Sequence, residues 1–492
     1  MHWRHLPNDC WLIQYDVGQE VTIDVLPDDV LLATFDFCVV KYQNPYSIAF
    51  DGYDPKRRIE SWKSLVHVCR RWRYLVFGSP RRLNLHLFCI PGTSTRNSSD
   101  VWPALPLFIE GKISQTSVDN VIAELEHSNR ICYINLDFHT TLQIESLWRA
   151  MQVPFLELTV LYLSFADLPY QPVLPDSFLG GSATRLRYLK LVDVPFLGLS
   201  KLLSSATHLV RLWLLNIPHS GYISPEAMVT CLSVLTSLEE LFFQFHSPQS
   251  CPDQESRSPP PPTRSVLPAL KRFSFRGVNE YLEELLGQID TPRLDHLSTI
   301  FFNDIDFDTP ELIRFITQTF KTPNVVHVVF DSLTACVTLQ HKEYSDYFAY
   351  VEILCRVPDW QLSSMAQICT SFFPFLSTME NLYIHENSPF DWKDGIENAE
   401  WLELLLPFTA VKNLYLSKQF APHIAPALQE ITGGGTTEVL FALQNLYLEE
   451  YRLSESVQEG IAQFISARKL ANRPVSISVW ERYADYLPDS YY

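Results

Sequence analysis

The chain has 492 residues, of which 47% are hydrophobic and 13% aromatic, and its formal net charge is -18 at pH 7. This length exceeds what one compact core can organise, so two or more domains, or one elongated repeat array, are expected. The acidic balance argues against a nucleic acid partner, because binding to phosphates requires a basic surface. No apolar run reaches the roughly 18 residues of a membrane span, and the start lacks signal-peptide character. We therefore expect no membrane association and an intracellular location, in the cytoplasm, the nucleus or both.

The sequence contains no recognisable catalytic or metal-binding motif. Its ten cysteines are scattered without CxxC pairs, which is typical of cysteine used as a small hydrophobic residue rather than as a disulfide or zinc ligand. Phosphate-binding loops and the GxSxG and HExxH motifs are missing. We therefore predict no catalytic residues, no metal and no cofactor. An unrecognised α/β enzyme stays open as an alternative, since catalytic residues can come from distant parts of a chain.

Residues 1–25 show no clear period and are expected to form a lead-in segment. A helix is then predicted from Pro27 onward, with Val30, Leu31 and Phe35 as its main apolar residues and Asp28 in the first turn, where the helix dipole favours an anion.

A second amphipathic helix is predicted around residues 68–76. One face carries the apolar residues Val68, Cys69, Trp72, Leu75 and Val76, and the opposite face carries Arg70, Arg71 and Arg73. These features predict a small helical domain over residues 26–82 with a basic outer face.

The two helices together resemble the F-box family, in which small helical modules dock on the Skp adaptor of cullin-RING ubiquitin ligases. The resemblance implies adaptor-binding roles for Leu26, Pro27, Val30, Leu31, Phe35, Trp62, Leu65, Val68, Cys69, Trp72 and Leu75. This chain departs from the family by an insertion at residues 41–58. Ten Lys and Arg against three acidic residues between Lys41 and Arg82 give a local charge of +7, leaving -25 for the rest. A basic module favours an acidic partner, and the resemblance implies that the Skp adaptor is acidic.

After a predicted strand at residues 82–88, a phrase of the form L-x-x-L-x-L recurs along the chain. Its copies begin at Ile131, Leu158, Leu186, Leu209, Leu238, Leu270, Leu297, Val325, Met379, Val411 and Leu443. Most intervals are 23 to 32 residues, close to the period of leucine-rich repeats, which stack a strand and a helix per unit into a horseshoe. Helices are predicted between these strands, at residues 118–127, 142–151, 280–289, 311–320 and near 363–373, with a last helix at 457–470 and a last strand at 475–479.

The predicted fold is therefore an α/β protein: an all-α F-box-like module, then a leucine-rich-repeat-like solenoid over residues 83–492. This combination resembles fungal-type F-box proteins. An ordinary Leu-rich α/β sheet is the alternative. The Asn or Cys that normally follows the strand is replaced, for instance by Val194 and Ile217, so the buried hydrogen-bond ladder that this Asn provides is not expected. A proline-rich exposed loop is predicted at 247–265, and an irregular unit with extra strands between Phe330 and Met379.

Within each phrase, the residue between the last two apolar positions is expected to face away from the core. These residues are Tyr162, Lys190, Trp213, Phe242, Ser274, Phe301, Val329, Tyr383, Tyr415 and Tyr447. Seven of the ten are aromatic, which is typical of recognition surfaces, and we predict target binding by the aromatic members and Lys190. Aromatic residues also suit strands and stack between neighbouring strands, so a purely structural role stays open.

Taken together, the resemblance implies a substrate-recognition subunit of an SCF-type ubiquitin ligase. Its module would dock the Skp adaptor, and through it a cullin, and its concave face would bind an unknown protein target. The alternatives are a leucine-rich-repeat scaffold without a ligase role and the α/β enzyme noted above.

Overall fold

A computed structural model gives the structure of the chain. It describes residues 2–5, 11–14, 20–22, 25–38, 61–80, 83, 85–90, 105–165, 168, 172–250, 264–302, 309–319, 323–340, 347–354, 358–371, 376–387, 397–430, 439–449 and 455–481. Contacts within the chain divide it into two compact units, Met1–Tyr170 and Gln171–Tyr492. The predicted insertion at 41–58 lies outside the described residues, as does most of the predicted proline-rich loop. The described part contains no helix with the length and apolar character needed to cross a membrane.

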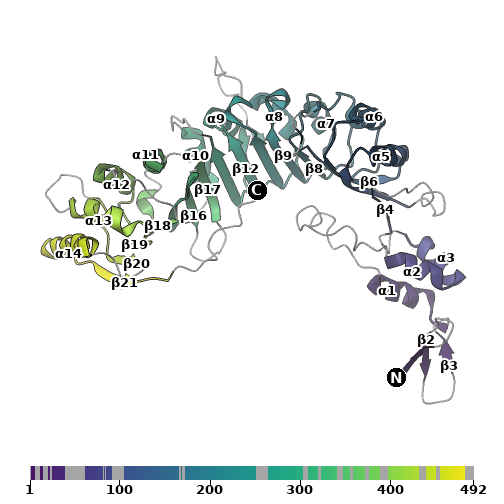
Figure 1. The fold of residues 1–492 in the computed structure, drawn as a ribbon, viewed down its shortest axis with the longest axis horizontal. Helices are drawn as coiled ribbons and strands as arrows, with labels where there is room; N and C mark the ends of the chain where they lie inside the picture. The colour runs from purple at the N-terminus through teal and green to yellow at the C-terminus, as the bar shows by residue number, and fades with distance from the viewer. Residues whose placement is uncertain are drawn as a thin grey trace. The chain divides into compact units, whose positions relative to one another are not determined.

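The chain is an α/β protein. Sixteen of the described strands belong to a long, mostly parallel sheet, and helices alternate with these strands along the chain (Figure 1). The predicted class and the predicted alternation of strands and helices are confirmed.

The first unit begins with a three-stranded antiparallel sheet in the lead-in segment, where the sequence showed no period. Its strands are β1 (His2–His5), β2 (Trp11–Gln14) and β3 (Glu20–Thr22). Three helices follow, which we call the helical module: α1 (Asp28–Cys38), α2 (Ser61–Val68) and α3 (Arg70–Gly78). Leu31 and Phe35, four residues apart on α1, are fully buried, and the ring of Phe35 lies 4.6 Å from that of Trp72.

The prediction of a continuous helix through Val68 and Cys69 is wrong. Cys69 has an extended backbone, with φ -156° and ψ 171°, and its Sγ accepts a hydrogen bond from the Trp72 N–H at 3.5 Å. Cys69 therefore caps a new helix, which supplies an acceptor for an amide that the helix itself leaves unpaired. The change of direction buries Leu75 and leaves Val68 53% exposed.

The rest of the first unit consists of parallel strands and two helices. The strands are β4 (Leu87–Cys89), β5 (Leu107–Ile113), β6 (Ile131–Phe138) and β7 (Val160–Ser164), and the helices are α5 (Val118–Leu125) and α6 (Ile144–Ala150). The strand predicted at 82–88 is shorter and begins later. The amide of Leu85 donates to the carbonyl of Pro80, so the chain is still turning there and pairs with β5 only from Leu87 onward.

In the second unit, the described strands of the long sheet are ordered β8-β9-β10-β12-β14-β17-β16-β15-β18-β19-β20-β21. Their bounds are β8 (Tyr188–Val192), β9 (Arg211–Ile217), β10 (Glu240–Phe245), β12 (Arg272–Gly277), β14 (His296–Phe301), β15 (Val325–Phe330), β16 (Thr334–Gln340), β17 (Tyr347–Leu354), β18 (Asn381–Glu386), β19 (Asn413–Leu416), β20 (Asn445–Leu448) and β21 (Ser476–Val479). Two short strands, β11 (Ser265–Val266) and β13 (Ile289–Asp290), pair separately.

The helices of the second unit connect successive strands. They are α7 (Leu199–Ser205), α8 (Pro225–Leu232), α9 (Asn279–Gln288), α10 (Pro310–Thr319), α11 (Pro358–Ser371), α12 (Asn398–Leu405), α13 (Ala421–Glu430) and α14 (Glu455–Leu470). The short 3-10 helices are η3 (Phe178–Gly181), η4 (His219–Gly221), η5 (Pro248–Ser250) and η6 (Leu376–Thr378). Figure 1 shows α8 and α9 together on one side of the sheet, near strands β8, β9 and β12.

The predicted irregular unit is present. Strand β16 is antiparallel to both β15 and β17. The remaining strand pairs of the long sheet within the second unit are parallel. This meander places β17 beside β14 and β15 beside β18. After β14 the chain therefore passes over two positions in the sheet to form β15, and β16 and β17 then fill those positions.

The recurring phrase forms a turn followed by a strand. In most copies the first apolar residue donates its N–H to the carbonyl three residues earlier, as Leu186 does to Ala183 and Leu209 to Ala206. The next two apolar residues point to the helical side and are buried, for example Leu212 and Leu214. The phrase thus supplies both the turn and the core-facing residues of each strand.

One copy of the phrase was predicted at the wrong position along the chain. Leu294 makes the turn, and Leu297 and Thr299 face the core, so the predicted set starting at Leu297 is displaced by three residues. Ser298, not Phe301, pairs with Ser274 across the strands, and Phe301 is buried. An odd shift along a strand exchanges its two faces, which explains why Phe301 points inward.

Candidate binding surface

Strand register aligns one residue from each strand of the second unit in a single row, which we call the central row. It runs Lys190, Trp213, Phe242, Ser274, Ser298, Tyr350, Thr338, His327, Tyr383, Tyr415, Tyr447 and Ser478. The face of the sheet that carries this row is opposite to the buried leucines, and we call it the outer face. Residues two positions before and after each central-row residue point to the same face.

Six of the residues predicted to bind a target lie in this row: Lys190, Trp213, Phe242, Tyr383, Tyr415 and Tyr447. All six are half-buried. The assignment of Phe301 to this row is wrong, and so is that of Val329, because His327 rather than Val329 pairs with Tyr383. Tyr162 belongs to the first unit, where it pairs with Asn135, and burial raises its pKa to about 12.

Tyr383, Tyr415 and Tyr447 form a stack, which we call the tyrosine ladder. Their ring centroids are 4.0 Å and 4.4 Å apart, with interplanar angles of 6° and 7°. The parallel register fixes this spacing, since neighbouring strands lie about 4.8 Å apart and each strand begins with the same Asn-Leu-Tyr sequence. The three side chains are half-buried, so the ladder is structural and also keeps part of its surface available for contact.

A second ladder, of asparagine side chains, lies beside the tyrosines on the outer face. The Nδ2 of Asn445 donates to Oδ1 of Asn413 at 2.7 Å, and the Nδ2 of Asn413 donates to Oδ1 of Asn381 at 2.8 Å. The ends are closed by the carbonyl of Asn324 and the hydroxyl of Ser476. This ladder differs from the one considered in the sequence, because its asparagines are the first residues of β18, β19 and β20 and do not follow the strands.

Trp480 packs on the edge of the tyrosine ladder, directly after β21. Its ring lies 5.8 Å from Tyr383 and 5.7 Å from Tyr415 in edge-to-face geometry, and its Nε1 donates to the carbonyl of Leu416 at 3.1 Å. The chain itself thus shows that an aromatic side chain can pack against the tyrosine edges while donating a hydrogen bond to the sheet.

The opposite end of the outer face combines aromatic and basic residues. Trp213 and Phe242 are 4.4 Å apart, and the Nζ of Lys190 lies 5.1 Å from the Trp213 ring. Two positions earlier in the register, the buried carboxylate of Glu240 pairs with Arg211 at 3.0 Å and also with Arg272. A carboxylate held by two guanidinium groups leaves this row positive.

The middle of the outer face carries buried polar groups. The Tyr350 hydroxyl donates to Glu352 at 2.5 Å, and burial raises the pKa of both groups. Burial, and then the nearby Glu352, also raises the pKa of the Cys336 thiol well above its usual range. A reactive cysteine needs its pKa lowered, so this arrangement does not activate Cys336 as a nucleophile.

The tyrosine ladder continues inward through His327, which stacks on Tyr383 at 4.5 Å and 13°. A hydrogen bond of 3.3 Å joins Nδ1 of His327 to Nε2 of His385, and both rings are buried. Burial lowers the pKa of His327 to about 4, so its ring is neutral at physiological pH.

The residues predicted to bind an adaptor divide into two groups in the helical module. Five are buried and hold the helices together: Leu31, Phe35, Trp62, Leu65 and Leu75. Pro27, Val30 and Val68 are exposed, and Leu26, Cys69 and Trp72 are half-buried. The second group is therefore the one available for direct contact.

Two of the three arginines expected on the outer side of α3 have intramolecular partners. Arg71 pairs with Asp28 at 2.6 Å and donates to the carbonyl of Leu26 at 2.6 Å, and Arg73 donates to the carbonyl of Val66 at 3.0 Å. Arg71 thus links α3 to the start of α1, which makes it part of the module's own structure.

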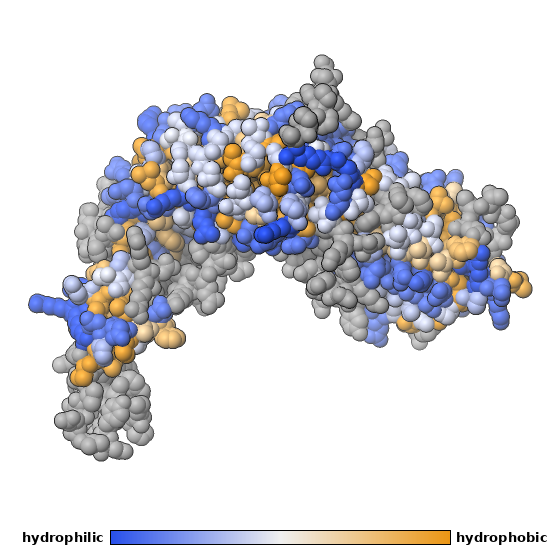
Figure 2. Space-filling view, turned by 180° about the vertical axis from the view of Figure 1, so that it is seen from behind, coloured by the Kyte–Doolittle hydropathy of each residue, from blue (hydrophilic) through white to orange (hydrophobic). Residues whose placement is uncertain are grey.

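Two exposed aromatic residues of the module were not predicted from the sequence. Phe37 is 92% exposed and Tyr74 is 80% exposed. Phe37 follows Val30, which is 41% exposed, by seven residues, so both lie on the same outward face of α1. That spacing was the available signal. Figure 2 shows hydrophobic residues at the surface of the module.

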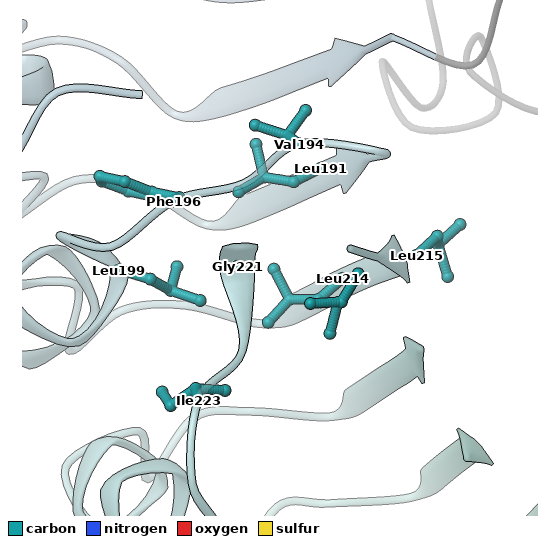
Figure 3. Close-up of a pocket in the computed structure, with 9 residues that line it drawn as sticks. Leu191, Val194, Phe196, Leu199, Leu214, Leu215, Gly221 and Ile223 are labelled. Atoms are coloured by element: carbon teal, nitrogen blue, oxygen red, sulfur yellow. The ribbon is translucent and has the colours of Figure 1, made fainter. Parts of the chain in front are cut away.

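A small cavity near η4 does not qualify as a ligand site. It has a volume of about 10 Å³ and apolar walls formed by residues such as Leu191, Phe196, Leu199 and Leu214 (Figure 3). A space of this size holds one water at most, which is too little for a ligand. Among the described residues, no His, Cys, Asp or Glu side chains are grouped in threes or more to hold a metal ion.

Comparison of the sequence with models of protein families and with curated proteins finds no match.

Proposed function

We propose that the chain is the substrate-recognition subunit of an SCF-type ubiquitin ligase. In this proposal the helical module docks a Skp adaptor, the repeated strands and helices are a leucine-rich-repeat-like solenoid, and the outer face binds a protein target. The observation that carries the proposal is the central row, in which tyrosines, Trp213 and Phe242 are held half-buried by strand register. Aromatic residues that are already ordered lose little entropy on binding.

The repeat geometry supports the solenoid. Each repeat consists of a turn, a short parallel strand and usually a helix. The strands that begin with Asn-Leu-Tyr follow one another at intervals of 32 residues. A ladder of identical side chains requires units that stack with one register, which is the property of solenoids.

The helical module supports adaptor docking. Its core is complete, because Leu31, Phe35 and Trp62 are buried, yet Phe37 and Tyr74 remain almost fully exposed. Large exposed apolar residues on a small folded module are typical of a protein contact.

The mechanism would be proximity. The chain would perform no bond chemistry, and a target held on the outer face would be presented at high effective concentration to the ligase subunits attached through the adaptor.

The test uses the full chain, purified with a tag and mixed with a Skp adaptor. The surface variant Val30→Glu/Val68→Glu places charge at two exposed module positions and leaves the buried core intact. The matched control is Leu142→Glu, which makes the same kind of change at another exposed residue of the first unit. We expect the unmodified chain and the control to capture the adaptor, and the double variant to lose at least about tenfold in affinity.

A target is identified by co-purification from cells and compared between the unmodified chain and a Tyr383→Ala/Tyr415→Ala variant. Loss of the target with retention of the adaptor supports the proposal. Failure of the unmodified chain to bind any Skp adaptor contradicts the ligase role and leaves a protein-binding scaffold. Loss of adaptor and target together from the tyrosine variant shows that the ladder is only structural.

A further inference from the structure

The outer face at strands β8, β9, β10, β12 and β14 is positively charged in a strongly acidic chain. By register, its outward positions include the cations Lys190, Arg211, Arg272 and Arg276 and the single acid Glu240, a net charge of +3 with histidine neutral. The whole sequence has a net charge of -18. We call these outward positions the basic section.

The basic section has an aromatic floor. Trp213 and Phe242 lie side by side in the central row, and Lys190 lies over the Trp213 ring. The floor is half-buried, so an apolar side chain placed on it would remove further apolar surface from water. Cations therefore flank an apolar platform.

The protein already displays how this section recognises an anion. Arg211 and Arg272 approach the carboxylate of Glu240 from the two neighbouring strands. Four positions after Arg272 on β12, Arg276 lies 5.5 Å from the Phe302 ring, and its buried Nε has no hydrogen-bond partner among the described residues. Guanidinium groups in fixed positions suit carboxylates, because two parallel N–H groups match two oxygens.

We propose that the basic section binds an extended acidic segment of a protein target, with carboxylates on Arg272 and Arg276 and an apolar side chain on Trp213 and Phe242. The inference rests on the proposed target-binding role of the outer face and adds the chemistry of the target. Five strands at about 4.8 Å spacing span about 19 Å, which is the length of about six residues in extended conformation. The segment is therefore short, with acidic and apolar residues interleaved.

The chemistry differs at the other end of the same face. The outward positions of β18, β19 and the start of β20 carry asparagine and tyrosine, apart from His385 at the end of β18, with Glu449 following β20. The acidic segment is thus assigned to the basic section and not to the tyrosine ladder. A nucleic acid is the less suitable anion, because its evenly spaced phosphates would also meet Glu240 and the acidic remainder of the chain.

The test measures binding of a fluorescein-labelled peptide in which glutamates alternate with leucine and phenylalanine, by fluorescence anisotropy with the full chain. A peptide with glutamine in place of every glutamate and a single-stranded oligonucleotide are the comparison probes. We expect the acidic peptide to bind at least about tenfold more tightly than the other two, and to weaken as salt is raised.

Two variants with opposite expected effects locate the site. Arg272→Gln/Arg276→Gln removes two cations and is expected to weaken the acidic peptide about tenfold. Glu240→Gln removes the internal carboxylate that competes for Arg211 and Arg272, and is expected to tighten binding several-fold. Because one variant weakens binding and the other strengthens it, a general loss of folding cannot imitate the pattern.

The control variant Arg149→Gln/Lys201→Gln removes the same charge from exposed positions on helices α6 and α7, and should bind the acidic peptide like the unmodified chain. Equal binding of the glutamine peptide, preference for the oligonucleotide, or equal weakening by the control overturns the inference. If the acidic peptide does not bind while Tyr383→Ala/Tyr415→Ala still loses a co-purifying target, the acidic-segment inference is wrong and the proposed function stands.

Discussion

Replacing Asn413 with alanine should destabilise the end of the sheet around β19. Asn413 is the middle of the asparagine ladder: it donates to Asn381 at 2.8 Å and accepts from Asn445 at 2.7 Å. Alanine removes both hydrogen bonds and leaves one acceptor and one donor without their ladder partners. A neutral hydrogen bond contributes about 1 kcal/mol, and these half-buried groups regain part of it from water, so we expect a loss of about 1–2 kcal/mol.

Amide hydrogen exchange is the suitable assay, because a chain of two units with repeated elements need not unfold in one step. The opening free energy of amides in β19 and β20 should fall in Asn413→Ala, with little change in β8 and β9. Gln444→Ala, an exposed change directly before β20, is the control and should have no effect. A loss below about 0.5 kcal/mol, or an equal loss in the control, would refute a stabilising role for the ladder.

Asn413→Asp sharpens the same test. An aspartate keeps an acceptor for Asn445 but turns a second oxygen toward the Oδ1 of Asn381, where an amide N–H donates now. At neutral pH the variant should therefore be less stable than Asn413→Ala. Protonation restores a donor, so the difference should shrink as the pH falls through the pKa of the new carboxyl group. No dependence on pH would mean that this position is open to water.

Two further predictions concern other buried or linked groups. Burial lowers the pKa of His327 to about 4, below the value of about 6.5 expected when unfolded, so folding favours the neutral ring. Stability should therefore be lost as the pH falls from about 6.5 toward 4, by up to about 3 kcal/mol. When the free energy of unfolding is measured with urea at several pH values in this range, it should change less with pH in His327→Gln than in the unmodified chain. Arg71→Gln removes the link to Asp28 and Leu26 and should cost about 1 kcal/mol, measured as faster exchange in the first turn of α1. An unchanged exchange rate in that turn would show that Arg71 does not hold it.

The sequence predicted the alternation of strands and helices because the L-x-x-L-x-L phrase carries two physical requirements at once. Its first apolar residue closes a turn, as Leu209 does, and the other two fill the core from alternate strand positions, as Leu212 and Leu214 do. The position of the phrase was predicted wrongly where apolar residues are too frequent. Around β14 the neighbouring Ile300, Phe301 and Phe302 imitate the pattern, and only the pairing of Ser274 with Ser298 fixes the frame.

Side-chain ladders were harder to predict, because they depend on contacts between strands 32 residues apart. Asn381, Asn413 and Asn445 are unremarkable one at a time, and they become a ladder only when parallel register aligns them. The break at Cys69 was missed for a different reason. Helical periodicity continues across Cys69, and cysteine is not one of the residues usually found at a helix N-cap. The pattern was therefore compatible with one helix or with two.

The two ends of the outer face set a requirement on any target that contacts both. Trp213 on β9 and Tyr383 on β18 are separated by seven strand spacings in the sheet order, or about 34 Å along its surface. Between them the outer face holds the pairs Tyr350–Glu352 and His327–His385, whose polar groups already bond within the chain. A target would therefore gain most at the two ends: from charge and an apolar platform at the basic section, and from aromatic edges and hydroxyl groups at the tyrosine ladder. Since these sites share no side chain, their contributions to the binding free energy should be nearly additive when both are mutated.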